Sequence, residues 1–486
     1  MQTNQHLSGY GLKLLLLALL LLLSPSTIAA SSARVVADVD SLISALKRAK
    51  AGEIIELLPG TYRMPKRVNL RANGTPEAPI IVRSAIPGAA ILHTPHTALF
   101  KVFGAHWQFH GIDFQGTGSS NHAFHVVGKA THVVIKGNRF QNFHAAIKVN
   151  GEGRPRHFPD HGRLIRNVFI NDGPRTTKWP VVAIDIVGGD DWLISENFIA
   201  DIAQGRRGRH GSPGFVKAGA SDSVFDRNFV ICEWLHSGGP RIGLSLGDGG
   251  SSPSGFDRRQ LGDCKKNCPE TINGRMTNNI IINCPHEPGI YLNRSVGGIV
   301  ANNTIFNAFG IQARFPETRI TIADNLLTGT VWARDDATIF EHNNVTTGFF
   351  DEAAYIPSLK EHLTHRISDY DKLYPSWISR DMVRTAQRTI ESTADWTSKT
   401  ILAQRHGPFK RWFYAPDVGD MSLARDDSPP FIAAGSKPPR VDHDFCGHPR
   451  TGQADIGAIQ YSAGHCDPNQ ELIRRHGKLF TDLTSP

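Results

Sequence analysis

The sequence predicts an all-β protein built as a single-stranded parallel β-helix, a β-solenoid, with an N-terminal helical cap and a partly helical C-terminal cover. Two observations predict this fold class. A short pattern of Asn followed by alternating aliphatic or aromatic residues recurs without helical spacing, and an apolar strand precedes its copies. A repeat of about 20 to 30 residues with strand and turn character is typical of stacked coils. The eight copies begin at Asn138, Asn167, Asn197, Asn228, Asn279, Asn303, Asn325 and Asn344.

The recurring asparagines also predict how successive coils are joined. Asn residues at one corner of stacked coils can form a ladder of side-chain amide hydrogen bonds, as in cross-β structures. The alternative is that each Asn only marks a turn, where its side chain bonds the local backbone. Recurrence over eight coils favours the ladder.

The composition excludes several other classes of protein. Of 486 residues, 40 % are hydrophobic and 20 % are charged, and the formal net charge is +8. These values are ordinary for a globular chain, so a disordered protein and a disulfide-framework miniprotein are excluded. A collagen and a polytopic membrane protein are excluded because the chain has no Gly-X-Y run and no second long apolar stretch.

Residues 1–30 are predicted to be a secretory signal peptide. Lys13 precedes the apolar run Leu14 to Leu23, which is followed by Ser24-Pro25-Ser26 and by small residues ending at Ala30. A run of ten residues spans only ~15 Å as a helix, half of a bilayer, so it is too short for an anchor. We therefore expect a secreted or periplasmic protein with no membrane anchor.

The six cysteines suggest disulfide bonds in an exported chain. Cys446 and Cys466 flank a short C-terminal segment, and Cys264 and Cys268 share one loop, which leaves Cys232 and Cys284 as partners for each other. Fifteen connectivities are compatible with six cysteines, and the sequence does not choose among them. A zinc site at Cys264 and Cys268 is the weaker alternative because no second ligand pair lies nearby.

The rest of the chain divides into three segments. Residues 31–74 are expected to form the cap and first strand, with a helix that is N-capped by Asp40 or Ser41 and ended by Gly52. Residues 75–350 form the β-helix, which is interrupted by an insertion at 247–274. Residues 351–486 form a cover, helix-prone between Leu359 and Gln404, that returns to the solenoid and shields its last edge.

The N-terminal segment carries a resemblance to a known superfamily. The helix is followed by Glu53-Ile-Ile-Glu-Leu-Leu-Pro-Gly-Thr-Tyr62 and then by Ala78-Pro-Ile-Ile-Val82. This opening resembles the entry of chondroitinase-B-like and alginate-lyase-like polysaccharide lyases of the pectin-lyase-like superfamily, over roughly residues 35–345. The resemblance implies a right-handed β-helix and the cleavage of an acidic polysaccharide by β-elimination.

Basic loops predict what the protein binds. They fall just before successive strands or asparagine corners, where loops of a β-helix line a groove. Such clusters favour a polyanion, and the absence of a nucleic-acid-binding module in an exported chain favours a uronate-containing polysaccharide over nucleic acid. The alternative is a solvated basic rim without a ligand. The candidate binding residues are Arg154, Arg156, His157, Arg206, Arg209, His210 and Arg258.

The resemblance also implies catalytic residues. In those lyases a base lysine is followed about one coil later by an arginine, and Lys217 and Arg241 occupy a similar order, with His236 beside them. Elimination next to a uronate needs a base for a weakly acidic C–H and positive charge for the carboxylate. Nearby positive charge favours the neutral, basic form of a lysine, and Arg241 would bind the carboxylate bidentately. Aligned on the asparagines, Lys217 matches Ile186 of the preceding coil.

Other readings of the same fold stay open. The metal-binding glutamates of those lyases are missing before Lys217, so we expect no cofactor, and calcium would have only Asp248 as a carboxylate ligand. Asp190 and Asp191 resemble the paired carboxylates of a glycoside hydrolase, although Gly-Gly-Asp-Asp is also a good turn. An epimerase and a non-catalytic polysaccharide-binding solenoid are further alternatives. In each case we expect a monomer.

Overall fold

The protein is described by a computed structural model. It covers residues 33–95, 97–118, 120–205, 210–249, 264, 267–285, 287–347, 409, 411–424, 429–436 and 440–484. The predicted signal peptide, the helix-prone segment 359–404 and most of the insertion at 247–274 lie outside the described residues.

A helix caps the N-terminal end of the solenoid. The helix α2 (Val39–Arg48) buries Leu42, Ala45 and Leu46 against the first coils. Its N-cap is Asp38, whose Oδ1 accepts a 2.8 Å hydrogen bond from the backbone N–H of Ser41. The predicted start at Asp40 or Ser41 is therefore two or three residues late, because the free amides of the first turn are satisfied by Asp38.

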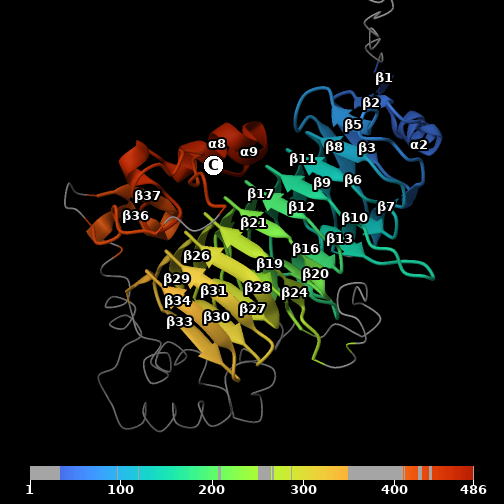
Figure 1. The fold of residues 1–486 in the computed structure, drawn as a ribbon. Helices are drawn as coiled ribbons and strands as arrows, with labels where there is room; N and C mark the ends of the chain where they lie inside the picture. The colour runs from blue at the N-terminus through green and yellow to red at the C-terminus, as the bar shows by residue number, and fades with distance from the viewer. Residues whose placement is uncertain are drawn as a thin grey trace, which may run out of the picture.

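Three long parallel sheets form the solenoid (Figure 1). Sheet A has 14 strands and opens each coil. Its strands in spatial order are β1 (Arg34–Val36), β2 (Ile54–Leu57), β5 (Ile80–Ser84), β8 (Trp107–His110), β11 (Val134–Lys136), β14 (Arg163–Ile165), β17 (Leu193–Ser195), β21 (Val224–Asp226), β25 (Arg275–Thr277), β28 (Ser295–Ala301), β31 (Arg319–Ala323) and β34 (Thr338–His342), with β24 (Thr271–Ile272) and β20 (Ala220–Ser221) as a side branch from β28.

Sheet B has 11 strands and follows sheet A in each coil. It contains β3 (Gly60–Arg63), β6 (Ala90–His93), β9 (Asp113–Gln115), β12 (Arg139–Gln141), β15 (Val168–Ile170), β18 (Phe198–Ala200), β22 (Phe229–Ile231), β26 (Ile280–Cys284), β29 (Thr304–Ala308), β32 (Leu326–Leu327) and β35 (Val345–Thr346).

Sheet C has 10 strands and closes each coil. It contains β4 (Val68–Leu70), β7 (Ala98–Val102), β10 (His122–Val127), β13 (Ile147–Asn150), β16 (Val181–Val187), β19 (Gly211–Lys217), β23 (Leu244–Leu246), β27 (Ile290–Asn293), β30 (Gly310–Arg314) and β33 (Thr330–Arg334). The chain is thus a right-handed parallel β-helix, and the predicted fold class is confirmed. The three-sheet pattern already begins with β2, β3 and β4, inside the segment assigned to the cap.

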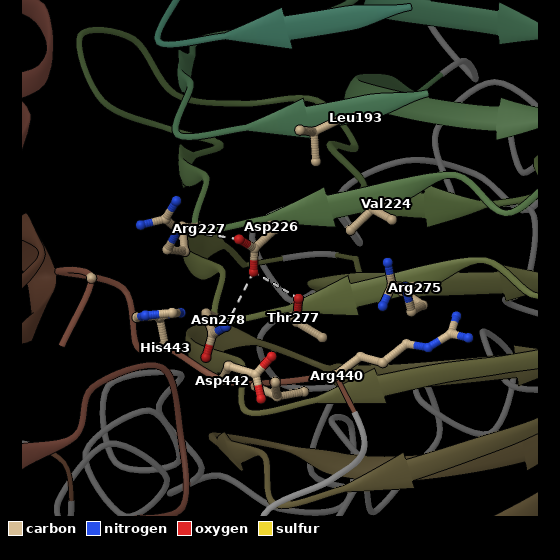
Figure 2. Close-up of a pocket in the computed structure, with 12 residues that line it drawn as sticks. Leu193, Val224, Asp226, Arg227, Arg275, Thr277, Asn278, Arg440, Asp442 and His443 are labelled. Carbon is tan, nitrogen blue, oxygen red and sulfur yellow. Dashed lines mark hydrogen bonds and ion pairs between the residues drawn. The ribbon is translucent and has the colours of Figure 1, made fainter. Parts of the chain in front are cut away.

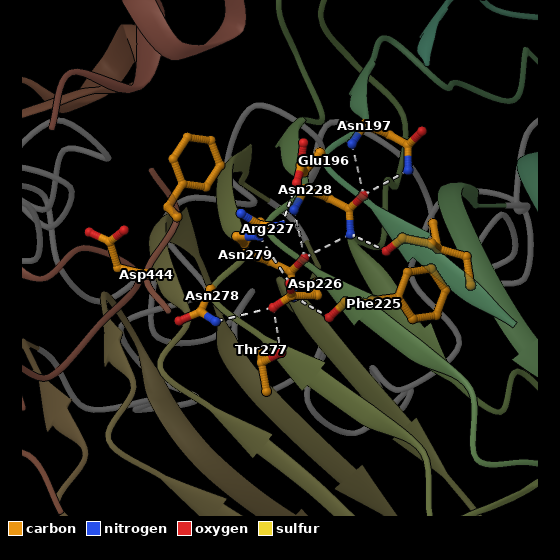
Figure 3. A network of polar contacts seen from close by, with 12 residues as sticks. Glu196, Asn197, Phe225, Asp226, Arg227, Asn228, Thr277, Asn278, Asn279 and Asp444 are labelled. Carbon is orange, nitrogen blue, oxygen red and sulfur yellow. Dashed lines mark hydrogen bonds and ion pairs between the residues drawn. The ribbon is translucent and has the colours of Figure 1, made fainter. Parts of the chain in front are cut away.

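The asparagine ladder is present. The side-chain amide of each of the first seven asparagines donates a hydrogen bond to the side-chain oxygen of the next Asn, at 2.9–3.1 Å. The same oxygen also accepts from the backbone N–H of the preceding Asn, as between Asn197 and Asn228 at 3.1 Å. Figure 3 shows three rungs of the ladder, Asn197, Asn228 and Asn279. The ladder satisfies backbone groups that the corner would otherwise bury without partners.

The interior of the solenoid is apolar and stacked in register. Phe114, Phe140 and Phe169 of sheet B lie directly above one another, with ring centroids 5.0 and 4.9 Å apart. Because neighbouring strands pair residue for residue, one apolar position per strand builds a continuous column.

The described part of the C-terminal segment packs along the side of the solenoid. It contains β36 (Phe413–Ala415), η2 (Pro416–Val418), β37 (Asp420–Leu423), η3 (Tyr461–Ala463), α8 (Pro468–His476) and α9 (Lys478–Thr484). Figure 1 shows β36, β37, α8 and α9 beside the coils. Phe413, Phe431 and Phe445 join one apolar cluster with Phe198 and Phe229 of sheet B. The described part of the cover therefore shields the outward face of sheet B, where Phe198 and Phe229 lie. That the cover also shields the last edge stays a prediction, because residues 348–408 lie outside the described residues.

Three disulfide bonds link the six cysteines. They join Cys232 to Cys284, Cys264 to Cys268 and Cys446 to Cys466. The zinc alternative at Cys264 and Cys268 is wrong, because both sulfurs are used in one disulfide. In the part of the chain that the structure describes, no helix is long and apolar enough to cross a membrane.

Candidate functional site

The outward face of sheet C carries a row of polar and aromatic side chains. One position per strand points inward, and Val149, Ile186, Val216 and Leu246 are fully buried there. The preceding position points outward, since side chains alternate along a strand. This outward row consists of His125, Lys148, Asp185, Phe215, Ser245 and Tyr291, each paired with the next across neighbouring strands. Neighbours in the row are about 5 Å apart.

Lys217 ends β19 and lies over this face. Its Nζ is 4.3 Å from the centroid of the Phe215 ring and 3.5 Å from Oδ2 of Asp248. The side chain is 14 % exposed, so the ammonium is partly shielded but reachable. Its strand partner in the preceding coil is Val187, not Ile186 as the asparagine alignment predicted. The turn between sheets C and A is one residue longer after Lys217 than after Val187, which shifts the alignment.

Asp248 reaches the face through a glycine turn. Gly247 has a φ of +75°, and a Cβ there would lie 2.0 Å from the carbonyl oxygen of Asn293, so only glycine fits. Oδ1 of Asp248 lies 3.2 Å from Nε2 of His210. Burial by itself would lower the pKa of His210, but the hydrogen bond and charge of Asp248 outweigh it and raise that pKa. Asp248 thus faces two cationic groups.

A calcium role for Asp248 does not fit these contacts well, because both of its oxygens face basic side chains. Within the described ranges, no group of three or more His, Cys, Asp or Glu side chains is arranged to hold a metal ion. The expectation about calcium dependence itself stays a prediction.

Two residues that the sequence analysis missed complete this end of sheet C. The Tyr291 hydroxyl accepts a 3.0 Å hydrogen bond from Nδ2 of Asn293. Burial raises the pKa of Tyr291, so the phenol keeps its proton at neutral pH. Arg314 pairs with Asn293 across the next strand and forms an ion pair with Asp335. The signal that could have found Tyr291 is its outward position in the apolar strand β27 (Ile290–Asn293).

Arg241 is not brought to Lys217. Arg241 pairs with Gly211 at the start of β19, whereas Lys217 ends that strand, so their Cα atoms are about 20 Å apart at ~3.3 Å per residue. The guanidinium is 2 % exposed and bonds Oδ1 of Asp201 at 3.3 Å and the carbonyl oxygen of Gly238 at 3.0 Å. The predicted cooperation of Arg241 with Lys217 is therefore wrong in this structure.

His236 contacts Arg241 and does not lie with Lys217 on the outward face of sheet C. Its Nδ1 accepts from Nη2 of Arg241 at 3.0 Å, and its Nε2 lies 3.2 Å from the carbonyl oxygen of Asn171. Both ring nitrogens are used to hold the loop that follows the Cys232–Cys284 disulfide. A chemical role for His236 would require these contacts to break.

The predicted basic loops are described only in part. Arg154, Arg156 and His157 are exposed in the loop between β13 and β14. That loop leaves the same end of sheet C as Lys217, two strands away, or about 10 Å. Arg206, Arg209 and Arg258 lie outside the described residues, so their predicted role stays a prediction.

The paired aspartates of the hydrolase alternative serve a turn. Oδ1 of Asp190 accepts a 2.9 Å hydrogen bond from the backbone N–H of Ser221. Asp191 has a φ of +51° and pairs with His161 at 3.0 Å and with Arg163 at 3.1 Å. These contacts support the turn reading of the Gly-Gly-Asp-Asp sequence.

Cavities among the described residues include one beside sheet A and one on sheet C. The cavity beside sheet A, about 480 Å³, lies between the outward face of that sheet and the C-terminal cover (Figure 2). Its carboxylate Asp226 is held by Thr277 at 2.7 Å and Asn278 at 3.1 Å, and it contains none of the predicted site residues. The smaller, about 290 Å³, lies on the outward face of sheet C beside Lys148 and Asp185. The face of sheet C therefore offers both the predicted lysine and a cavity.

Comparison with known proteins gives distant structural matches. No family model and no curated protein matches the sequence. Similar solved structures include an alginate lyase from Paenibacillus sp. str. FPU-7 (15 % identity, 65 % of this chain and 95 % of that chain, TM-score 0.41). Pectate lyase Pel9A is 15 % identical and is matched over 86 % of this chain and 90 % of that chain, with a TM-score of 0.36. A rhamnogalacturonan lyase is 12 % identical and is matched over 71 % of this chain and 93 % of that chain, with a TM-score of 0.45. Glycoside hydrolases also occur among the matches. At these identities the likeness is one of fold.

Proposed function

We propose that the protein is an exported polysaccharide lyase that cleaves a uronate-containing polysaccharide by β-elimination on the outward face of sheet C. The observation that carries this proposal is the gathering of Lys217, Tyr291 and Arg314 at one end of that face. Asp248 links them, since it is the ion-pair partner of Lys217 and also acts on the Tyr291 hydroxyl electrostatically.

The chemistry assigns one role to each group. Arg314, with the Asn293 amide beside it, binds the uronate carboxylate and stabilises the charge that develops there. Lys217 takes the proton from the carbon next to the carboxyl group. The carbon–oxygen bond to the leaving sugar breaks, and the leaving oxygen receives the Tyr291 proton, which the raised pKa of Tyr291 keeps in place. The product carries an unsaturated uronate at its new end.

The role of the base sets a condition on this mechanism. A lysine takes up a proton only after it has lost its own, so we expect turnover to increase as the pH is raised. Binding of the polymer should not require this loss, because the ammonium attracts the uronate carboxylate.

Charge and disulfides support the rest of the proposal. The exposed basic loop with Arg154 and Arg156 would extend the positive surface next to Lys217. Three disulfides are typical of proteins that fold in an oxidising compartment, which fits export through the predicted signal peptide. Polymer binding should weaken as salt rises, since screening acts beyond ~8 Å at physiological ionic strength.

The test is the ultraviolet absorbance of unsaturated uronate ends during incubation with alginate, polygalacturonate, xanthan and glycosaminoglycans. We expect product from at least one of them, and Tyr291→Phe should lower its rate by about 100-fold, as loss of a proton-transfer group typically does. New ends that are saturated would show a hydrolase. Binding without cleavage would show a non-catalytic solenoid. Either result would overturn the proposal.

A further inference from the structure

The smaller cavity on sheet C has features that the proposed elimination does not use. It measures about 290 Å³, close to the lower limit of ~300 Å³ for ligand pockets. It lies over β10, β13 and β16, on the side of Lys217 away from Tyr291. Its lining residues are Asn121, His122, His144, Ala145, Lys148, Trp179, Pro180 and Asp185.

Asp185 lines this cavity and has one carboxylate oxygen without a partner among the described residues. Its Oδ2 forms a 2.6 Å ion pair with Nζ of Lys148, while its Oδ1 is buried without a hydrogen-bond partner among the described residues. Asp185 is only 9 % exposed. A buried acceptor without a donor is unfavourable, so this oxygen is suited to a ligand that donates a hydrogen bond.

His122 adds a second acceptor. Its Nδ1 lies 2.8 Å from the carbonyl oxygen of Ala145 and must donate to it, which leaves Nε2 with its lone pair. Burial lowers the pKa of His122 to about 4, so the ring is neutral near pH 7. Burial also lowers the pKa of His144, whose Nδ1 is 2.6 Å from Oδ1 of Asn121. Neither imidazole brings a positive charge to the cavity.

Trp179 provides an apolar platform at the rim. It is 58 % exposed, yet its backbone is held, because its carbonyl oxygen accepts a 2.9 Å hydrogen bond from Nε2 of Gln204. A large exposed aromatic ring on a fixed backbone, next to polar groups, is suited to a ligand with one apolar face and polar edges. A sugar ring has this character.

The charges distinguish this cavity from the Lys217 end of the same face. Among the described residues that line the cavity, Lys148 and Asp185 neutralise each other and both histidines are neutral. One cation lies at the rim, where Nζ of Lys178 is 5.3 Å from the centroid of the Trp179 ring. A carboxylate would meet the Asp185 oxygen and be repelled. A hydroxyl group would instead donate to that oxygen. The cavity is thus built for an uncharged sugar.

We infer that this cavity is a subsite for a neutral sugar unit, next to the uronate position at Lys217. Asp185 and Phe215, over which Lys217 lies, are paired on adjacent strands, about 5 Å apart. The substrate would then be a heteropolysaccharide in which uronate is linked to a neutral sugar. This statement about the substrate rests on the proposed lyase function, whereas binding of a neutral sugar at the cavity does not.

The test is a direct binding measurement that needs no catalysis. Cellobiose, mannobiose, galactobiose and digalacturonate are titrated into the full protein by calorimetry. We expect at least one neutral disaccharide to bind and digalacturonate not to bind at this cavity. Trp179→Ala should weaken the neutral disaccharide by about tenfold, the scale of one lost aromatic contact. Tyr414→Ala, which removes an aromatic ring 69 % exposed on the cover, is the matched control and should change nothing.

A charge variant checks specificity separately from folding. Asp185→Asn keeps the shape but frees the Lys148 ammonium, so it should lose the neutral disaccharide and gain digalacturonate binding. No neutral disaccharide bound by the wild-type protein, or equal binding by Trp179→Ala, would overturn the subsite. Cleavage of uronate homopolymers alone would overturn the mixed-substrate statement and leave the lyase proposal standing. Absence of any cleavage would refute the lyase proposal and leave the binding result to decide the subsite.

Discussion

Two basic clusters lie at opposite ends of β19, and they differ in how completely neighbouring groups of the protein bind their cations. At the start of the strand, Arg241 is 2 % exposed and bonds Asp201, His236 and two backbone carbonyl groups. At its end, Lys217 is 14 % exposed and its ion-pair distance to Asp248 is a longer 3.5 Å. The first cluster has its donors satisfied by shorter hydrogen bonds, whereas the Lys217 ammonium is held by longer contacts, 3.5 Å to Asp248 and 3.4 Å to the carbonyl oxygen of Gly249.

The difference teaches how a charged residue on a β-helix should be judged. A buried guanidinium with a full set of partners holds a loop in place, and its removal leaves a buried carboxylate unpaired. An ammonium that is 14 % exposed and held by longer contacts over an aromatic ring costs the fold less to lose. Stability and activity should therefore respond oppositely to substitutions in the two clusters.

The largest effect on stability is expected for Arg241→Met. The change leaves Asp201 buried without its cation, so the free energy of unfolding should fall by about 3–5 kcal/mol. Denaturant unfolding measures it, and the exposed Arg67→Met provides the control. The double variant Asp201→Asn with Arg241→Met should recover part of the loss. A stability equal to that of the wild-type protein would show that the Arg241 cluster is not structural.

The next largest effect on stability is expected at acid pH, through the buried histidines. Burial lowers the pKa of His122 to about 4 and that of His476 to about 3. The unfolded chain takes up these protons near pH 6.5, so stability should fall as the pH drops from about 6.5 to 4. For His122 the loss approaches 3 kcal/mol, at ~1.4 kcal/mol per pKa unit.

His210 should act in the opposite direction. Its pKa is raised, because Asp248 outweighs burial, so its contribution is complete below pH 6.5 and is lost as the pH rises through the raised value. Unfolding measured from pH 4 to 8 for wild type, His122→Gln and His210→Gln checks both signs. If His122→Gln keeps the full acid sensitivity and His210→Gln alone removes it, the assignment is reversed.

A smaller loss is expected for His236→Ala. The change takes one acceptor from Arg241 and leaves the carbonyl oxygen of Asn171 without its donor, which should cost about 1–3 kcal/mol. His157→Ala, at an exposed position, is the matched control and should change stability by less than ~0.5 kcal/mol. A loss of turnover in His236→Ala without a loss of stability would instead support the catalytic role of His236 that the sequence analysis predicts.

The smallest effect on stability is expected for Lys217→Met. The Lys217–Asp248 contact is long, at 3.5 Å, Asp248 keeps His210 as a partner at 3.2 Å, and the methionine side chain can still cover Phe215, so the loss should be well below that of Arg241→Met. Thermal unfolding should place this variant close to the wild-type protein. A loss as large as that of Arg241→Met would mean that both clusters are structural.

The features that repeat from coil to coil could be predicted from the sequence. The contacts that depend on strand register could not. The asparagine ladder follows from spacing, because each Asn occupies the same corner of its coil. Lys217 and Arg241 are in the order expected of a catalytic pair, but order along the chain does not state which end of a strand a residue occupies. The single extra residue in the turn after Lys217 shifts its strand partner from Ile186 to Val187.

Tyr291 and Arg314 were missed for a related reason. They follow the 247–274 insertion, so they lie far from Lys217 in sequence, and only strand pairing brings their strands to the same face. The cavity beside Asp185 was missed because its lining residues come from separate coils, and none of them forms a motif. Contacts across coils are not visible in a linear pattern.

The measurement that tests the central claim most directly is the rate of unsaturated uronate formation by Lys217→Met on the polymer that the wild-type protein cleaves. Lys136→Met, an exposed lysine on sheet A, is the matched control. If Lys217 acts on the substrate and contributes little to the fold, Lys217→Met should keep the wild-type stability and lose a factor of about 10²–10⁴ in rate, while Lys136→Met keeps its rate. A fully active and stable Lys217→Met protein would contradict the account.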